Sequence, residues 1–234
     1  MGFYESLSAM VRPKQSIELM MDEFLITLRD ITLYISFVYP LLYLVRLKNS
    51  DRPYKYFTAY LVVMGLIQLG MLASVKWFGA TTNIYFFHYY FISQFILLSL
   101  FYEDLLKYKW IHVITGLVLC FLVFQYIKEP EMYYRYNPLG STITQIILVA
   151  YALLYMYKSL SGSKIFVIVN AGLLVYLLSS ILIFASGNMA FDINFSISTT
   201  KLLTNINSVL YFVFQILIFI EWYKNYRFKK SIES

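Results

Sequence analysis

The sequence predicts an all-α integral membrane protein, a bundle of seven transmembrane helices with its N-terminus outside and its C-terminus in the cytoplasm. Of its 234 residues, 60% are hydrophobic and only 14% are charged, and the mean hydropathy is +0.64. Soluble domains carry about 25% charged and 45–50% apolar residues. The apolar residues also gather in stretches of about 20, the length that crosses a bilayer core. A water-soluble enzyme is thereby excluded.

Charged residues divide the apolar sequence into seven predicted spans. The last six contain no charge except Lys201 and Glu221, which lie near the two ends of the seventh, whereas the first contains Arg29 and Asp30. The charges that bound the later spans are, in chain order, Lys55, Lys76, Glu103, Lys109, Lys128, Arg135, Lys158, Lys164, Asp192 and Lys224. The predicted spans are Phe24–Arg46, Tyr56–Val75, Asn83–Tyr102, Trp110–Ile127, Leu139–Tyr157, Ile165–Ser186 and Thr199–Trp222.

The distribution of lysine and arginine predicts the orientation, because cytoplasmic loops hold the excess of these residues. Six basic residues fall on one side, namely Arg12, Lys14, Lys76, Lys128, Arg135 and Lys201. Twelve fall on the other, namely Arg46, Lys48, Arg52, Lys55, Lys107, Lys109, Lys158, Lys164, Lys224, Arg227, Lys229 and Lys230. The second side is therefore assigned to the cytoplasm. This topology accounts for the net charge of +6 without a nucleic-acid partner.

Three segments follow from this topology. Residues 1–23 contain Glu5, Glu18, Asp22 and Glu23 and lack an apolar run, so no cleavable signal peptide is expected. They form a predicted extracytoplasmic segment, residues 24–223 form the bundle, and residues 224–234 form a basic cytoplasmic tail. No predicted loop is long enough for an appended domain. We expect a multi-pass protein of the cell inner membrane, surrounded by lipid.

Polar residues within the spans point to the outer half of the bundle. Such residues are costly in lipid and usually face the bundle interior. Lys201, Asn205 and Ser208 share one helical face, and helix 3 carries an aromatic run from Tyr85 to Phe91. The hypothesis is an outward-facing polar and aromatic cavity for a small ligand; its candidate residues are Arg29, Asp30, His88, Gln145, Lys201 and Asn205. The alternative is structural, with hydrogen bonds between helices and Arg29 reaching to the headgroups.

The sequence contains no recognised catalytic, nucleotide-binding or metal-binding motif. Cys120 is the single cysteine, and His88 and His112 fall near opposite faces of the predicted membrane. We therefore expect no metal and no cofactor. A lipid-modifying intramembrane enzyme stays open, because an arginine, an aspartate, a histidine and a lysine lie near one face. No spacing singles out a nucleophile or base among them.

Four short segments resemble a family of small heptahelical inner-membrane proteins of Bacteroidota. These segments are Arg46–Pro53, Asn83–Tyr90, Val169–Tyr176 and Thr204–Tyr211. The resemblance implies a sensory or accessory role beside a two-component histidine kinase, and it transfers no catalytic residue. The expected function is thus a receptor-like or regulatory membrane module that binds a small ligand or partner outside and signals through a cytoplasmic partner. The alternatives are a small-solute transporter or channel and a structural subunit of a larger membrane complex.

Overall fold

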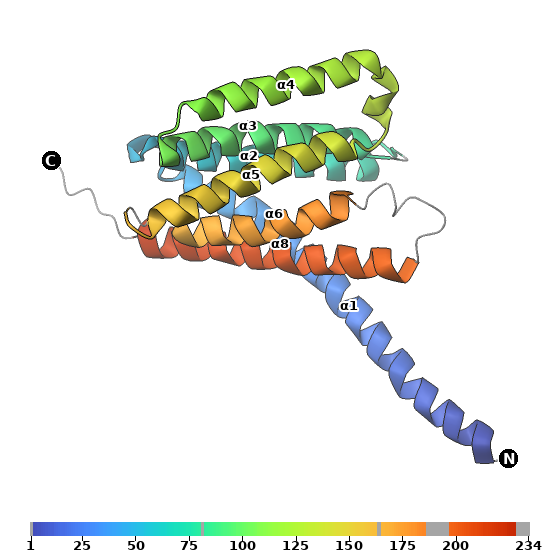
Figure 1. The fold of residues 1–234 in the computed structure, drawn as a ribbon. Coiled ribbons are helices and arrows are strands. Elements are labelled where there is room, and N and C mark those ends of the chain that lie inside the picture. Colours follow the sequence, from blue (N-terminus) through green and yellow to red (C-terminus); the bar gives the residue numbers. More distant parts are fainter. Residues whose placement is uncertain (1, 81, 163–164, 186–196, 228–234) are drawn as a thin grey trace.

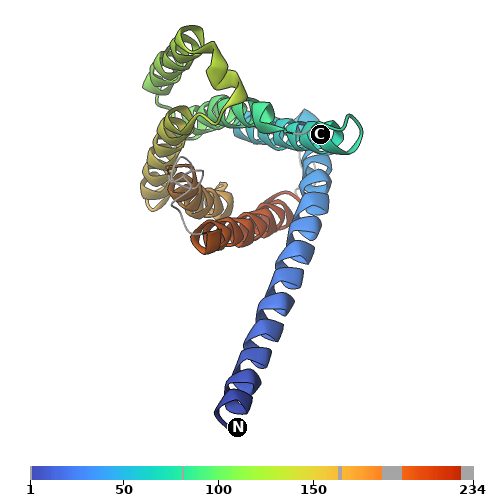
Figure 2. The ribbon, with the colours of Figure 1, turned by 90° about the vertical axis from the view of Figure 1, so that its right-hand side faces the viewer.

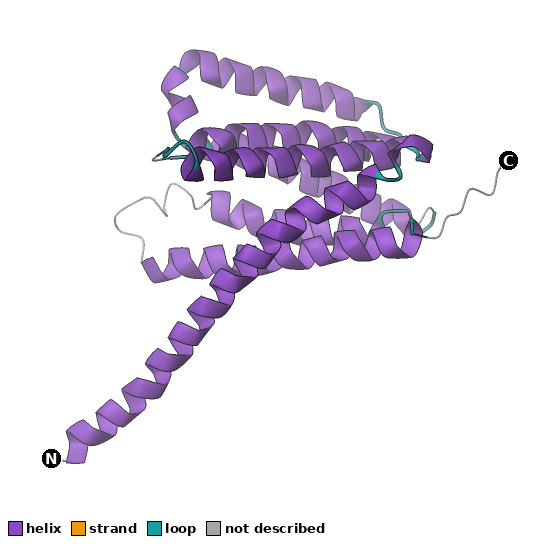
Figure 3. Ribbon diagram, turned by 180° about the vertical axis from the view of Figure 1, so that it is seen from behind, coloured by secondary structure: helices purple, strands orange, loops and turns teal. Residues whose placement is uncertain are grey.

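The computed structural model describes residues 2–80, 82–162, 165–185 and 197–227, and within these ranges all regular secondary structure is helical (Figure 3). Two short 3-10 helices, η1 and η2, span Leu47–Asn49 and Pro130–Tyr134. The α-helices are α1 (Gly2–Leu44), α2 (Arg52–Lys76), α3 (Ile84–Leu106), α4 (Trp110–Lys128), α5 (Pro138–Ser159), α6 (Val167–Ala185) and α8 (Ile197–Asn225).

Six of the described helices contain a stretch long and apolar enough to cross a membrane. These stretches are Met20–Leu44, Arg52–Lys76, Ile84–Leu106, Trp110–Lys128, Pro138–Ser159 and Asn205–Asn225. The described apolar part of α6, Val167–Leu182, is shorter, and the predicted end of the sixth span at Ser186 lies outside the described residues. The prediction of an all-helical fold is confirmed for the described residues, and the six apolar helices are consistent with a membrane bundle.

Helix ends differ from the predicted spans where helices continue past the apolar stretch. The first span was expected to begin at Phe24, but α1 begins at Gly2 and has 43 residues, or about 65 Å of helix. Its N-terminal part projects away from the other helices (Figure 1). Helix α8 likewise extends to Asn225. Hydropathy marks the part of a helix that lies in lipid, whereas backbone hydrogen bonds allow the same helix to continue into water.

Six of the helices form a closed ring. Contacts join α1 to α2, α2 to α3, α3 to α5, α5 to α6, α6 to α8 and α8 back to α1. Helix α4 packs against α3 and η2 and lies outside the ring (Figure 2). Consecutive helices run in opposite directions (Figure 1). As a result, the α1–α2, α3–α4 and α5–α6 connections meet the C-terminus of α8 at one end, which we call the basic end after its lysine and arginine residues.

Closely packed aromatic side chains fill the ring near the basic end. The ring of Phe57 lies 5.4 Å from that of Phe101 and 5.5 Å from that of Phe166, measured between centroids. All three side chains are at most 1% exposed. Phe166 has a φ of 58°, in the left-handed region that few non-glycine residues adopt. This conformation places its ring in the core directly before α6 begins.

Candidate functional site

Near the middle of the bundle, hydroxyl and amide groups gather inside the helix ring. We call this group the tyrosine layer. Its members are Tyr39, Tyr60, Tyr90, Tyr176, Tyr211, Gln94 and Gln215.

The tyrosine layer draws one phenol from each of five ring helices, α1, α2, α3, α6 and α8. Two of these helices also contribute an amide. Gln94 follows Tyr90 by four residues, and Gln215 follows Tyr211 by four residues. Side chains four apart lie above one another on the same helical face. The local sequence therefore directs a phenol and an amide together toward the ring interior.

Contacts within the layer link helices that are far apart in sequence. The hydroxyl groups of Tyr90 and Tyr176 are hydrogen-bonded at 2.9 Å, which connects α3 with α6. The Gln94 Nε2 donates to the Tyr60 hydroxyl over 3.4 Å, which connects α3 with α2. The rings of Tyr176 and Tyr211 lie 5.2 Å apart, between α6 and α8. Movement of one of these helices would therefore disturb contacts on the others.

Gln215 is a member of the layer with unused hydrogen-bonding capacity. Its side chain is 0% exposed, and in the described part of the structure neither amide atom has a hydrogen-bond partner. Tyr39 and Tyr211 lie beside one another next to this amide, but without a hydrogen bond of ordinary geometry to it. Buried polar groups in proteins are nearly always hydrogen-bonded. The Gln215 amide is thus the atom group best suited to bind a further molecule here.

The layer is uncharged, which restricts the chemistry that it can support. It holds phenol and amide groups and no aspartate, glutamate, lysine or arginine. A charged ligand would lose its hydration there without gaining a counter-ion. No cluster of three or more metal-ligating side chains occurs among the described residues. The arrangement suits a small uncharged molecule that both donates and accepts hydrogen bonds.

A second polar group lies between the layer and the basic end. The Tyr102 hydroxyl donates to Asn170 Oδ1 over 2.8 Å, and Asn170 Nδ2 donates to the Ala152 carbonyl over 3.1 Å. These bonds join α3, α5 and α6. Asn170 is fully buried and uses both its amide nitrogen and its amide oxygen. This group is therefore already satisfied, in contrast to Gln215.

The structure places four of the six predicted ligand residues near the N-terminal part of α8 or on the exposed surface of α1. Arg29 and Asp30 are exposed, and Arg29 Nε donates to the Leu25 carbonyl of its own helix over 3.3 Å. Lys201 forms an ion pair with Asp22 at 2.6 Å. The fourth residue, Asn205, is half-buried on α8. The ion pair connects α8 to α1 but does not include Arg29.

The other two predicted residues, His88 and Gln145, are buried in different surroundings. His88 Nδ1 is hydrogen-bonded to the Tyr126 hydroxyl at 2.6 Å, and the His88 ring stacks on Tyr133 at 5.7 Å. A hydrogen bond to Tyr89 raises the pKa of Tyr133 to about 12. Gln145 lies on α5 with its Oε1 unpartnered. Among the described residues, no hydrogen bond or ion pair joins any two of the six predicted residues.

The tyrosine layer was not predicted from the sequence, and of its tyrosines only Tyr90 lies in the aromatic run Tyr85–Phe91 noted above. Tyrosine has an apolar ring and a hydroxyl that usually finds a partner when buried. The four-residue spacing in Tyr90/Gln94 and Tyr211/Gln215 was the available signal. It places a phenol and an amide on one face in the middle of two predicted spans.

Comparisons of this chain with protein-family models, with curated proteins and with solved structures find no match. The resemblance to a Bacteroidota family therefore stays a prediction. Any functional assignment must come from the residues and their geometry.

Proposed function

We propose that the chain is a receptor-like or regulatory protein of the inner membrane, with the basic end in the cytoplasm. It binds a small uncharged molecule in the tyrosine layer and passes this event to a cytoplasmic partner. The observation that carries the proposal is the buried Gln215 amide, unpartnered among the described residues, within a layer of phenols from five helices.

The layer is suited to signalling because its hydrogen bonds connect helices of the ring. A net hydrogen bond between buried groups is worth about 1 kcal/mol. A ligand that exchanges two or three of these bonds for its own would change the balance between helix arrangements by about 1–3 kcal/mol, the usual range of allosteric coupling. Such a coupling corresponds to a 5- to 150-fold change in the affinity for a partner.

The basic end is the proposed output surface. Its lysines and arginines favour a cytoplasmic location and an anionic partner or lipid surface. The proposal assigns the output to a partner that contacts this surface. The resemblance makes a histidine kinase the first partner to test.

The ligand site is tested by thermal unfolding of the full chain in nanodiscs against a panel of small uncharged alcohols, amides and phenols. Compounds that raise the unfolding temperature of the wild type are then applied to Gln215→Leu. The matched control is Gln68→Leu, because Gln68 lies on α2 and is partly exposed. We expect the stabilising effect to be lost in Gln215→Leu alone. The site would be refuted if the compounds raised the unfolding temperature of both variants equally. It would also be refuted if no compound in the panel stabilised the wild type.

The signalling role is tested separately, with a histidine kinase that co-purifies from the native membrane. Its autophosphorylation is measured in proteoliposomes with and without this chain and a stabilising compound. We expect the compound to change the kinase rate only when the wild-type chain is present. An unchanged rate would reject kinase regulation without affecting the ligand site.

A transporter is the second candidate, because polar groups continue from the tyrosine layer through Tyr102 and Asn170 toward the basic end. Uptake of a stabilising compound into proteoliposomes, reduced in Asn170→Leu, would favour transport. Binding without uptake would favour the receptor.

A further inference from the structure

A cavity of about 390 Å³ lies at the basic end, separate from the tyrosine layer. It is bordered by the start of α2, the end of α3, the C-terminal part of α5 and the residue before Phe166. Its lining residues are Asp51, Arg52, Pro53, Asp104, Leu105, Lys107, Tyr155 and Ile165. Small-ligand sites usually measure about 300–1,000 Å³. This cavity therefore suits a molecule of headgroup size.

One side of the cavity favours an anion. Helix α2 begins there with 25 residues, and its N-cap residue Asp51 makes no side-chain capping bond. Helix N-termini attract phosphate through free backbone N–H groups and the helix dipole. Arg52 is the first residue of α2 and has no ion pair among the described residues. A guanidinium binds phosphate in a bidentate manner.

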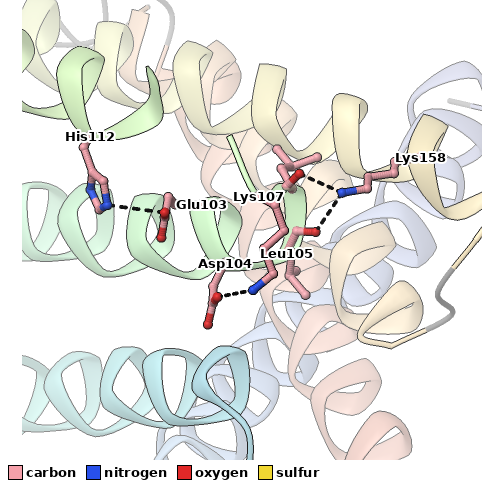
Figure 4. Close-up of polar contacts among 7 residues, drawn as sticks. Glu103, Asp104, Leu105, Lys107, His112 and Lys158 are labelled. Carbon is pink, nitrogen blue, oxygen red and sulfur yellow. Dashed lines mark hydrogen bonds and ion pairs between the residues drawn. The ribbon is translucent and has the colours of Figure 1, made fainter. Parts of the chain in front are cut away.

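The other side favours a hydrogen-bond donor with positive charge. The Asp104 side chain is 9% exposed, and its Oδ1 is paired with Lys107. Its Oδ2 has no hydrogen-bond partner in the described structure and is turned away from Lys107 (Figure 4). An ionised carboxylate has about four acceptor positions. The Asp104 carboxylate borders the cavity, so a positively charged donor bound there would form a charge-assisted contact with it.

Neighbouring cations are held in other contacts. Lys107 follows the last turn of α3 with a φ of 62°, which turns the chain and directs its ammonium to Asp104. Lys158 of α5 donates to the Leu106 carbonyl over 2.7 Å and the Leu105 carbonyl over 3.3 Å (Figure 4). These bonds cap the C-terminus of α3, which favours cations. Among the described residues that line the cavity, Arg52 is thus the cation without an ion pair.

We propose that this cavity binds a small zwitterion in which a phosphate and a primary ammonium are joined by a short linker. The phosphate lies at Arg52 and the N-terminus of α2, and the ammonium lies at Asp104. Among the described residues, the lining holds two carboxylates and two cations. An anion alone would face Asp51 and Asp104, and a cation alone would face Arg52 and Lys107. The source is either a free aminophosphate or the headgroup of an aminophospholipid. The assignment does not rest on the proposed function.

The test uses the full chain in phosphatidylcholine nanodiscs and phosphoethanolamine as the probe, with calorimetric titration. Phosphocholine carries the same charges but no N–H donor, and inorganic phosphate carries no cation. We expect phosphoethanolamine to bind at least tenfold more tightly than either. We also expect at least a tenfold loss in Arg52→Gln and in Asp104→Asn. The matched control is Arg135→Gln at the opposite end, which should change binding less than twofold.

Arg52→Gln keeps the test decisive if Asp104→Asn does not fold, because Arg52 is exposed. The lipid source is tested by replacing part of the phosphatidylcholine with phosphatidylethanolamine. A higher unfolding temperature in wild type but not in Arg52→Gln supports the headgroup, whereas binding of the free probe alone supports a soluble aminophosphate. Equal binding of phosphocholine, or binding unaffected by Arg52→Gln, would overturn the proposal. So would the absence of any effect from both the free probe and the lipid.

Discussion

The carboxylate of Glu221, near the end of α8, accepts a hydrogen bond from the backbone N–H of Phe166 over 3.1 Å. It also accepts one from the N–H of Ile168 over 3.2 Å and one from Asn225 Nδ2 over 2.5 Å. Glu221 is 0% exposed. A carboxylate of one helix thus supplies the N-terminal cap of another, where helix dipole and free N–H groups favour negative charge.

Replacing Glu221 by leucine should destabilise the protein by about 3 kcal/mol, because buried backbone N–H groups lose their acceptor. Glu221→Gln retains one acceptor oxygen and should cost less. The measurement is unfolding of the detergent-solubilised chain, followed by circular dichroism. Glu129→Leu is the control, since Glu129 is exposed at the far end of α4. Equal stability of Glu221→Leu and wild type would show that the cap contributes nothing.

Removing the Tyr126 hydroxyl should loosen the connection between α4 and α5. This hydroxyl bonds His88 Nδ1 at 2.6 Å, and Asn137 Nδ2 donates to it over 3.5 Å. Tyr126→Phe should cost about 1 kcal/mol and increase amide exchange in η2. Tyr134→Phe is the matched control because Tyr134 is 75% exposed. If amide exchange in η2 were unchanged in Tyr126→Phe, ring stacking alone would account for the stability of this connection.

The ion pair between Lys201 and Asp22 should contribute little to stability. The Lys201 and Asp22 side chains are 56% and 40% exposed. Exposed pairs are typically worth about 0.2–1 kcal/mol, and salt weakens them. A double-mutant cycle with Lys201→Ala and Asp22→Ala should give a coupling below about 1 kcal/mol. A larger coupling that persists in high salt would indicate that the pair is more shielded from water than the structure shows.

Hydropathy was sufficient to find the helices because lipid-facing surface imposes a composition on every span. It could not find the ring, since the order α1, α2, α3, α5, α6, α8 depends on side-chain packing between helices distant in sequence. The same limit affected the candidate site. Lys201 and Asn205 do share part of α8, but whether that face meets Arg29 or Asp22 depends on the rotation of α1, which a local pattern does not contain.

Close packing of α6 on α8 provides a final prediction. A Cβ atom at Gly172 would lie 2.9 Å from Leu217 Cδ1 and 2.9 Å from Phe214 Cδ2, closer than carbon atoms tolerate. Phe214 is 1% exposed, so its ring has little room to move. Gly172→Ala should therefore separate the helices and cost about 1–3 kcal/mol, the usual range for overpacking. The measurement is thermal unfolding in detergent.

Gly116 in α4 is the matched control, since apart from the adjacent residues and backbone of its own helix no described atom lies within 4 Å of the Cβ position there. Gly116→Ala should be neutral or stabilising by up to about 1 kcal/mol, because alanine favours helix more than glycine does. If Gly172→Ala lowers the unfolding temperature and Gly116→Ala does not, then α6 and α8 are in tight contact while α4 faces open surroundings. If both variants were stabilised equally, the close approach of α6 to α8 would be wrong, and with it the position of Tyr176 beside Tyr211 in the tyrosine layer.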